Sequence, residues 1–255
     1  DDKPFFLATG FIRPHYPNVA PEQYFDRYPY KRMELPFVPK NDWDDIPKRG
    51  ISQSNSERFG IDKFPENQKR MWAGYLATVT FMDEQVGRII KTLKELGLDK
   101  NTAVFFTSDH GYLLGEHHFW QKGNLREEVT RVPLIMKVPG QKPGESLSIV
   151  ELVDLFPTAC ALSGLPTPKS VQGKSLLPIL GNSKATVKKT AFSFTESGTS
   201  MRTSNWSYMR YKDGNEELYD MRKDPKQFKN LAQDSALEKE LKGQRKLFQN
   251  RKKDL

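Results

Sequence analysis

The sequence predicts an α/β fold, in which helices flank a sheet, joined to a small α+β subdomain. Apolar and β-branched runs at residues 5–11, 102–107 and 132–138 predict buried strands. Apolar residues at helical spacing over 68–96 predict one long helix between the first strand and the second. The order strand, helix, strand, loop, strand is typical of an α/β sheet with helices on its faces.

The predicted helices have recognisable ends. Gly97 follows the long helix as a stop signal. A second helix is expected to begin after Asp154, whose side chain suits a cap, and to stop at Gly164. Ser235 and Glu238 have the spacing of a capping box, which predicts the start of a final amphipathic helix.

The pattern changes after residue 182, where the apolar runs become short and turn residues separate them. We therefore divide the chain into two predicted domains, 1–182 with the larger sheet and 183–255 with a small antiparallel sheet and a helix. The strands expected in the second domain cover residues 191–196, 200–212 and 216–221. A turn at 213–215, with sequence Asp-Gly-Asn, joins the last two.

The composition fits a globular protein, since 36% of the 255 residues are apolar and 28% are charged. The formal net charge is +8, and much of the excess gathers near the C-terminus, where basic residues suit the negative end of a helix dipole. No nucleic-acid motif accompanies this charge, so we expect no nucleic-acid partner. A positive field favours an anionic substrate. No apolar run approaches the roughly 20 residues that span a bilayer.

The N-terminus reads as an opening directly into the first predicted strand, without the layout of a signal peptide. We expect the chain to be part of a longer protein, because a core strand is an unusual place for a domain to begin. Cys160 is the one cysteine, so the chain has no intrachain disulfide.

Asp109, His110 and Gly111 follow the strand predicted at 102–107, at the edge where α/β sheets bind ligands. A carboxylate and an imidazole on adjacent residues can both reach one cation, and the glycine lets the backbone turn away. The same pair is also compatible with a structural hydrogen bond at a strand end. By itself it leaves both interpretations open.

The surrounding sequence is more specific. Residues 107–124 read TSDHGYLLGEHHFWQKGN, and residues 131–135 read RVPLI. This stretch resembles the second signature region of the sulfatases of the alkaline-phosphatase superfamily, especially the iduronate-2-sulfatase-like branch. The resemblance continues in PFFLATGFIRPH at 4–15, ELVDLFPT at 151–158, GKSL at 173–176 and ELYD at 217–220. It implies part of an alkaline-phosphatase-like sheet, and the several motifs agree in order.

The resemblance implies a role for each matching residue. Asp109 and His110 would bind a divalent metal, normally calcium, and Lys122 would contact the sulfate group. His15 would contact the sulfate or protonate the leaving oxygen. The His110 nitrogen suits zinc better than calcium, which prefers oxygen ligands, so Asp109 is the firmer ligand of the two.

Three further residues are weaker candidates for substrate contact: Arg13, His117 and Arg126. The arginines could contact an anionic substrate, but each could equally form a structural ion pair. His117 and His118 are adjacent on a loop and must diverge. We therefore expect at most one of them, His117, to line the site, and His118 to lie at the surface.

The family's nucleophile is a formylglycine made from the Cys or Ser of a C-x-P-S-R motif, and this motif does not occur in the sequence. Cys160 is followed by Ala-Leu-Ser-Gly, which lacks the required Pro and Arg. The resemblance therefore implies a sulfuric-ester hydrolase acting on a sulfated sugar or related ester, with this chain supplying the later half of the metal and sulfate site. The formylglycine is expected on a missing N-terminal portion, the main partner of this chain.

Two other functions remain open from the residues. One is a phospho- or phosphonate-ester hydrolase of the same superfamily, with zinc or manganese at the Asp-His pair. The other is an inert binding module, because the isolated chain lacks the nucleophile and is expected to be inactive. The resemblance also implies an exported or lysosomal protein, although no residue of this sequence indicates the compartment.

Overall fold

We describe a computed structural model of the chain, covering residues 3–51, 61, 64 and 66–252. The chain forms two compact units. The first contains Asp1–Phe37 and Ser56–Asn101, and the second contains Val38–Asn55 and Thr102–Leu255. The domain boundary predicted after residue 182 does not coincide with a boundary of these units, and it stays a prediction.

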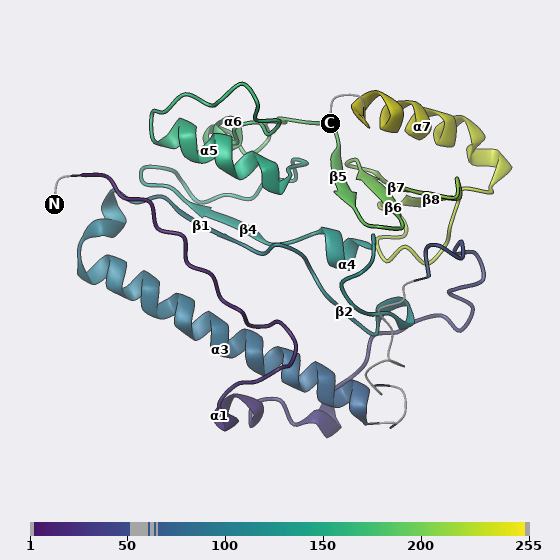
Figure 1. Ribbon diagram of the computed structural model, residues 1–255, viewed down its shortest axis with the longest axis horizontal. Helices are drawn as coiled ribbons and strands as arrows, with labels where there is room; N and C mark the ends of the chain where they lie inside the picture. Colours follow the sequence, from purple (N-terminus) through teal and green to yellow (C-terminus); the bar gives the residue numbers. More distant parts are fainter. Residues whose placement is uncertain (1–2, 52–60, 62–63, 65, 253–255) are drawn as a thin grey trace. The chain divides into compact units, whose positions relative to one another are not determined.

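The first unit is built on one long helix, α3 (Asn67–Glu95), which confirms the helix predicted at 68–96. It ends before Gly97, whose φ of 70° lies in the left-handed region that glycine adopts readily. The short helix α1 (Glu22–Phe25) packs beside it (Figure 1). The Tyr24 hydroxyl donates to Glu84 Oε2 over 2.7 Å, which ties α1 to the middle of α3. A 3-10 turn, η1 (Tyr30–Arg32), and another, η2 (Leu98–Lys100), complete the unit.

Residues 5–11 do not form the buried strand predicted for them. The segment is extended and runs alongside α3 (Figure 1), but no described strand pairs with it. Phe6 is 87% exposed and Leu7 70% exposed. A strand needs a neighbour to satisfy its backbone N–H and C=O groups, so an apolar run alone did not suffice to predict one here.

The second unit contains two small antiparallel pairs. In the first, β1 (Val104–Thr107) pairs with β4 (Leu134–Lys137), with Thr107 opposite Leu134. These strands confirm the strands predicted at 102–107 and 132–138 in shortened form, but not their burial, since both are only partly buried and Ile135 is 62% exposed. The second pair joins β2 (Leu113–Leu114) to β3 (Trp120–Gln121), and α4 (Glu127–Thr130) follows. The chain from β1 to β4 thus carries most of the predicted site residues.

A four-stranded antiparallel sheet forms the C-terminal part, in the order β5 (Ala191–Phe194), β6 (Gly198–Arg202), β7 (Trp206–Tyr211), β8 (Glu216–Asp220). The single strand predicted at 200–212 is wrong. It is two strands, because the backbone turns at 203–205, where the Thr203 hydroxyl accepts a hydrogen bond from Trp206 N at 3.0 Å. The turn predicted at 213–215 is confirmed, with Gly214 at a φ of 89°.

The final helix, α7 (Glu238–Lys252), covers one face of this sheet (Figure 1). The sheet and the helix share one buried cluster, which contains Phe192, Met201, Trp206, Tyr208, Leu218, Leu241 and Phe248. The predicted Ser235–Glu238 capping box is replaced by Asp234, whose carboxylate accepts from Ala236 N at 2.9 Å. An aspartate one residue earlier serves the same purpose, since any short acceptor at the start satisfies a free N–H.

Three short helical segments follow β4 and precede β5 along the chain: η4 (Leu152–Asp154), α5 (Leu155–Leu162) and α6 (Leu177–Gly181). Asp154 does not cap α5 as predicted. Its carboxylate instead accepts from Glu151 N and Lys174 N, both at 2.8 Å, and pairs with Lys188 at 2.6 Å. Among the described residues, no helix is both long enough and apolar enough to cross a membrane.

Candidate active site

The Asp109–His110 pair follows the carboxyl end of β1, as expected from the strand predicted at 102–107. His110 Nε2 is 3.6 Å from Asp109 Oδ2, and the side chains are 30% and 85% exposed, respectively. His110 Nδ1 lies 2.8 Å from the Gly111 carbonyl oxygen. Because a carbonyl only accepts, Nδ1 donates this hydrogen bond, and Nε2 is the ring nitrogen that lies toward the Asp109 carboxylate.

Gly111 closes the loop that follows the pair. Its N–H donates to the Val129 carbonyl over 2.7 Å, and a Cβ at this position would lie 1.9 Å from the carbonyl oxygen of Glu128. Residue 111 must therefore be a glycine for this approach to exist. The loop 112–128 consequently leaves from the neighbourhood of the pair and returns to it.

Lys122 lies on this loop, directly after β3, and is exposed. Its backbone carbonyl accepts from Asn124 N at 2.8 Å, and Asn124 Oδ1 accepts in turn from Arg126 N at 3.0 Å. The preceding residue, Gln121, has a φ of 73°. A tight turn thus sets the direction in which the Lys122 backbone leaves the hairpin formed by β2 and β3. His118 is exposed, as predicted.

His117 and Arg126, both predicted to contact substrate, are buried instead. Their side chains are 1% and 0% exposed. His117 Nδ1 is 2.9 Å from Asp42 Oδ2, and Arg126 Nη2 is 2.6 Å from Glu217 Oε2. Side chains enclosed and paired in this way hold the fold together and do not fit a direct contact with substrate.

The pair Arg126–Glu217 belongs to a closed polar network inside the second unit. The hydroxyls of Tyr211 and Tyr219 both donate to Glu217. Burial would lower the pKa of Arg126, but the charge of Glu217, together with the interactions of Tyr219 and Tyr211, outweighs burial and raises that pKa above its ordinary value. Burial and the Glu217 charge raise the pKa of Tyr211, so this phenol stays protonated and keeps donating.

Arg13 and His15 lie in the first unit, in the loop before α1. Arg13 Nε donates to the Val19 carbonyl over 2.8 Å, and its Nη1 donates to the His15 carbonyl over 3.2 Å. The ring of His15 is exposed, with Nδ1 2.6 Å from the Tyr16 carbonyl oxygen. The proton is therefore on Nδ1, and Arg13 shapes the loop that carries this ring.

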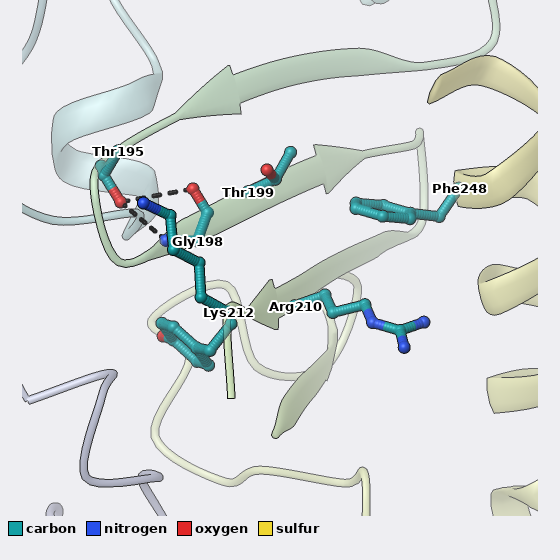
Figure 2. A pocket seen from close by; sticks show the side chains of 7 residues that line it. Thr195, Gly198, Thr199, Arg210, Lys212 and Phe248 are labelled. Atoms are coloured by element: carbon teal, nitrogen blue, oxygen red, sulfur yellow. Dashed lines mark hydrogen bonds between the residues drawn. The ribbon is translucent and has the colours of Figure 1, made fainter. Parts of the chain in front are cut away.

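Two surface hollows contain little of the predicted site. One, of about 420 Å³, lies in the first unit between residues 10–13, including Arg13, and Phe81, Met82 and Gln85 of α3. The other, of about 380 Å³, lies against β6 and β7 and includes Arg210, Lys212 and Phe248 (Figure 2). Figure 2 also shows the Thr195 hydroxyl bonded to Gly198 across the β5–β6 turn, which forms one wall.

The described residues do not complete a metal site by themselves. No group of three or more His, Cys, Asp or Glu side chains among them is arranged to hold an ion. The Asp109 carboxylate and the His110 Nε2 atom provide two donors on one side of β1. Calcium takes six to eight oxygen ligands. The pair therefore fits a divalent ion only as part of a larger ligand set.

The sequence interpretation missed Asp42, Trp43 and Glu217. Asp42 and Trp43 lie in a polar stretch without periodicity, and nothing local links them to His117, 74 to 75 residues later. Glu217 had a usable signal. It follows Glu216 in a predicted strand, and adjacent strand residues face opposite sides, so one of the two carboxylates had to point inward.

Comparisons with known proteins agree on a family. A sulfatase family model matches residues 1–165, and a model for the C-terminal region of N-sulphoglucosamine sulphohydrolase matches residues 115–253. A sulfatase of Formosa agariphila is 33% identical over 237 residues, covering 90% of this chain and 46% of that protein. Mouse iduronate 2-sulfatase is 36% identical over 202 residues, covering 65% of this chain and 37% of that protein. The chain spans about half the length of these relatives, or less.

Solved structures give the same picture. A structure described as a complex with its substrate, D-glucosamine-2-N,6-O-disulfate, has a TM-score of 0.72 and 30% identity, covering 88% of this chain and 49% of that one. A phosphonate monoester hydrolase from Silicibacter pomeroyi has a TM-score of 0.83 and 27% identity, covering 96% of this chain and 55% of that one. The expected alkaline-phosphatase-like fold is thereby confirmed. The chain belongs to the sulfatase family of the alkaline-phosphatase superfamily and matches its C-terminal region.

Proposed function

We propose that the protein containing this chain is a sulfuric-ester hydrolase, and that the chain supplies the later half of its metal and sulfate site. One observation carries the proposal. Asp109 Oδ2 and His110 Nε2 lie 3.6 Å apart at the exposed end of β1. The loop that carries Lys122 begins and ends beside them, because Gly111 N donates to the Val129 carbonyl.

In this proposal Asp109 and His110 hold a divalent cation, most simply Ca²⁺. The bound ion would neutralise charge on the sulfate oxygens while the ester bond breaks. His110 Nδ1 donates to the Gly111 carbonyl, so Nε2 is the ring nitrogen that would serve as the ligand. The remaining ligands would come from residues outside the described set.

Lys122 and His15 would act on the substrate itself. Lys122 is exposed, and an ammonium acts as a compact positive charge for a sulfate oxygen. His15 has its proton on Nδ1, and its exposed ring could donate a proton to the departing alkoxide once Nε2 is protonated as well. Arg13 holds the backbone of the His15 loop.

The nucleophile would come from a separate part of the same protein. The 255 residues contain no C-x-P-S-R motif, so we propose that an N-terminal portion carries the formylglycine and covers this chain. The partial coverage of the relatives supports this proposal, since the chain matches 46% of one and 37% of another. The isolated chain is then expected to be inactive.

Sulfated sugars are the proposed substrate class. Similarity to iduronate 2-sulfatase and to a structure bound to a disulfated glucosamine supports it, as does the net charge of +8, which attracts anions. We assign the chain to the iduronate-2-sulfatase-like branch on its 107–124 motif, with an exported or lysosomal location as in that branch.

Sulfate release by the full-length protein tests the proposal. We expect release from a sulfated glucosamine or uronate, and loss of it in His110→Ala. Lys142→Ala is the control, because Lys142 is exposed and lies outside the loop that carries Lys122. Phosphonate monoesters should be assayed alongside, because a phosphonate monoester hydrolase shares the fold at a TM-score of 0.83. Hydrolysis of phosphonates without sulfate release would replace the proposed activity.

A further inference from the structure

The hairpin that precedes Lys122 has an unusual backbone. Gly115 has a φ of 110°, and the residues His117, His118 and Gln121 have φ values of 56°, 58° and 73°. Non-glycine residues rarely adopt positive φ, because Cβ then crowds the carbonyl oxygen. Three such residues within five positions need support from outside the hairpin to persist.

That support comes from two consecutive residues in the same compact unit. Asp42 Oδ2 lies 2.9 Å from His117 Nδ1, and Trp43 Nε1 donates to the His117 carbonyl over 2.6 Å. The Trp43 ring also stacks on Phe119, with centroids 5.5 Å apart. Side chain and main chain of His117, one of the left-handed residues, are thus held at once.

The segment that carries Asp42 is itself fixed. Ile46 is buried with Leu113, Phe119 and Val129 in one cluster. Asp45 Oδ2 accepts from Asn230 N at 2.9 Å. These contacts of Asp45 and Ile46 hold the segment that carries Asp42, and the hairpin takes its position from that segment.

Stability alone is a poor explanation for Asp42. Its side chain is 0% exposed, and its Oδ1 atom has no hydrogen-bond partner among the described residues. An apolar pair of similar volume commonly stabilises a fold as well as a buried charged pair does. What the carboxylate adds is a defined orientation for the His117 ring and for the turn around it.

The hairpin transmits this orientation to Lys122. Gly115 N donates to the Phe119 carbonyl over 2.9 Å, and Leu114 pairs with Trp120 across the strands. Lys122 follows the second strand directly. We infer that Asp42 is a positioning residue, which holds His117 and through it the hairpin that presents Lys122 to the anionic group of the substrate. This inference rests on the proposed function for the role of Lys122.

Hydrogen exchange tests the contacts of Asp42 and Trp43 with His117 without any measurement of activity. In Asp42→Leu, which keeps the branching of the side chain but removes the acceptor, we expect the amides of Gly115, His118 and Phe119 to exchange about tenfold faster or more, with no change in β5–β8. Asp44→Leu is the matched control, because Asp44 is an exposed aspartate in the same segment. Trp43→Phe keeps a ring on Phe119, removes the hydrogen bond to His117, and should raise exchange in the same amides. Unchanged exchange, or an equal rise throughout the unit, would overturn the inference.

Kinetics of the full-length protein test the link to Lys122. Asp42→Leu should lower kcat by roughly 10- to 100-fold, the usual range for residues that orient a functional group. In a Lys122→Ala background the same change should cost less than about twofold, because its effect acts through Lys122. Equal losses in both backgrounds would show a general structural role and sink the inference. A wild-type protein that releases no sulfate would refute the proposed function. The exchange result would still show whether Asp42 holds His117 and the hairpin in place.

Discussion

Two parts of one loop use the same residue types in opposite ways. At 109–111, Asp109 stays 85% exposed and His110 keeps 30% of its side chain at the surface. At 117–126, His117 and Arg126 are almost completely enclosed and paired with carboxylates. The difference teaches that a histidine or arginine in a signature motif has no fixed role. Its partners decide whether it meets a ligand or holds the fold.

Loss of a side chain should affect the stability of the fold differently in the two regions. Loss of an exposed ligand residue leaves the fold intact, because little surrounds it. Loss of one member of a buried pair leaves the other charge without compensation, which is strongly destabilising. Changes at Asp109 and His110 should therefore act on chemistry, and changes at His117 and Arg126 should act on structure.

Asp109→Ala should lower kcat/KM of the full-length protein by about 10³-fold or more, because it removes a proposed metal ligand and the charge that goes with it. The free energy of unfolding should change by no more than about 0.5 kcal/mol. Sulfate release and denaturant unfolding measure the two effects, and Asp44→Ala serves as control. A variant that unfolds would contradict the expectation that loss of the exposed Asp109 side chain leaves the fold intact.

Arg126→Met should destabilise the chain by about 3–5 kcal/mol, because it leaves the buried Glu217 carboxylate without its cationic partner. Adding Glu217→Gln should recover part of this loss, since a neutral amide oxygen still accepts from Tyr211 and Tyr219. Denaturant unfolding measures both. Lys242→Met, which removes an exposed ion pair with Glu238, should cost less than about 1 kcal/mol. An equally small loss for Arg126→Met would contradict the structural role.

Gly111→Ala should cost about 1–3 kcal/mol, the usual price of overpacking, because the new Cβ would lie 1.9 Å from the Glu128 carbonyl oxygen. It should also lower sulfate release, since the loop could no longer return to the Asp109–His110 pair. Gly87→Ala is the control. Apart from the adjoining backbone of α3, no atom of the described residues lies within 4 Å of its Cβ position, so this change should stabilise by roughly 0.5–1 kcal/mol. Matching losses at both glycines would argue against the close approach.

Arg245→Met tests a partly exposed pair and should have the smallest effect. Burial raises the pKa of Glu216, but hydrogen bonds from Arg245 and Tyr208 outweigh it and hold that pKa below its ordinary value of 4.5. A depressed carboxylate pKa stabilises the fold above about pH 4.5 and loses this effect as pH falls through the folded value. The variant should be less stable by about 1 kcal/mol near neutral pH. Unfolding at several pH values should show the difference shrinking in acid; a constant difference would exclude this linkage.

Local elements could be predicted well from the sequence because their causes are local. The apolar spacing over 68–96 predicted α3, and Gly97 predicted its end. The Asp-Gly-Asn turn and the strand before Asp109 are confirmed for the same reason. The motif order predicted the sulfatase family, and the comparisons confirm it.

Predictions failed where partners from elsewhere in the chain decide the outcome. Residues 5–11 are apolar enough for a strand, but no described strand pairs with them. Residues 200–212 read as one strand because the turn at Thr203 depends on a side-chain hydrogen bond to Trp206 N. Arg126 looked available for substrate because its partner, Glu217, lies 91 residues away.

The sequence by itself determined the family, the Asp109–His110–Gly111 motif and the position of Lys122 soon after it. Only the tertiary structure decided which polar residues face outward and which are enclosed. It brought Asp42 to His117 and Glu217 to Arg126, and it required a glycine at residue 111. The physical reason is that burial and charge pairing are set by contacts between distant segments, and those contacts leave no periodic signal in the chain.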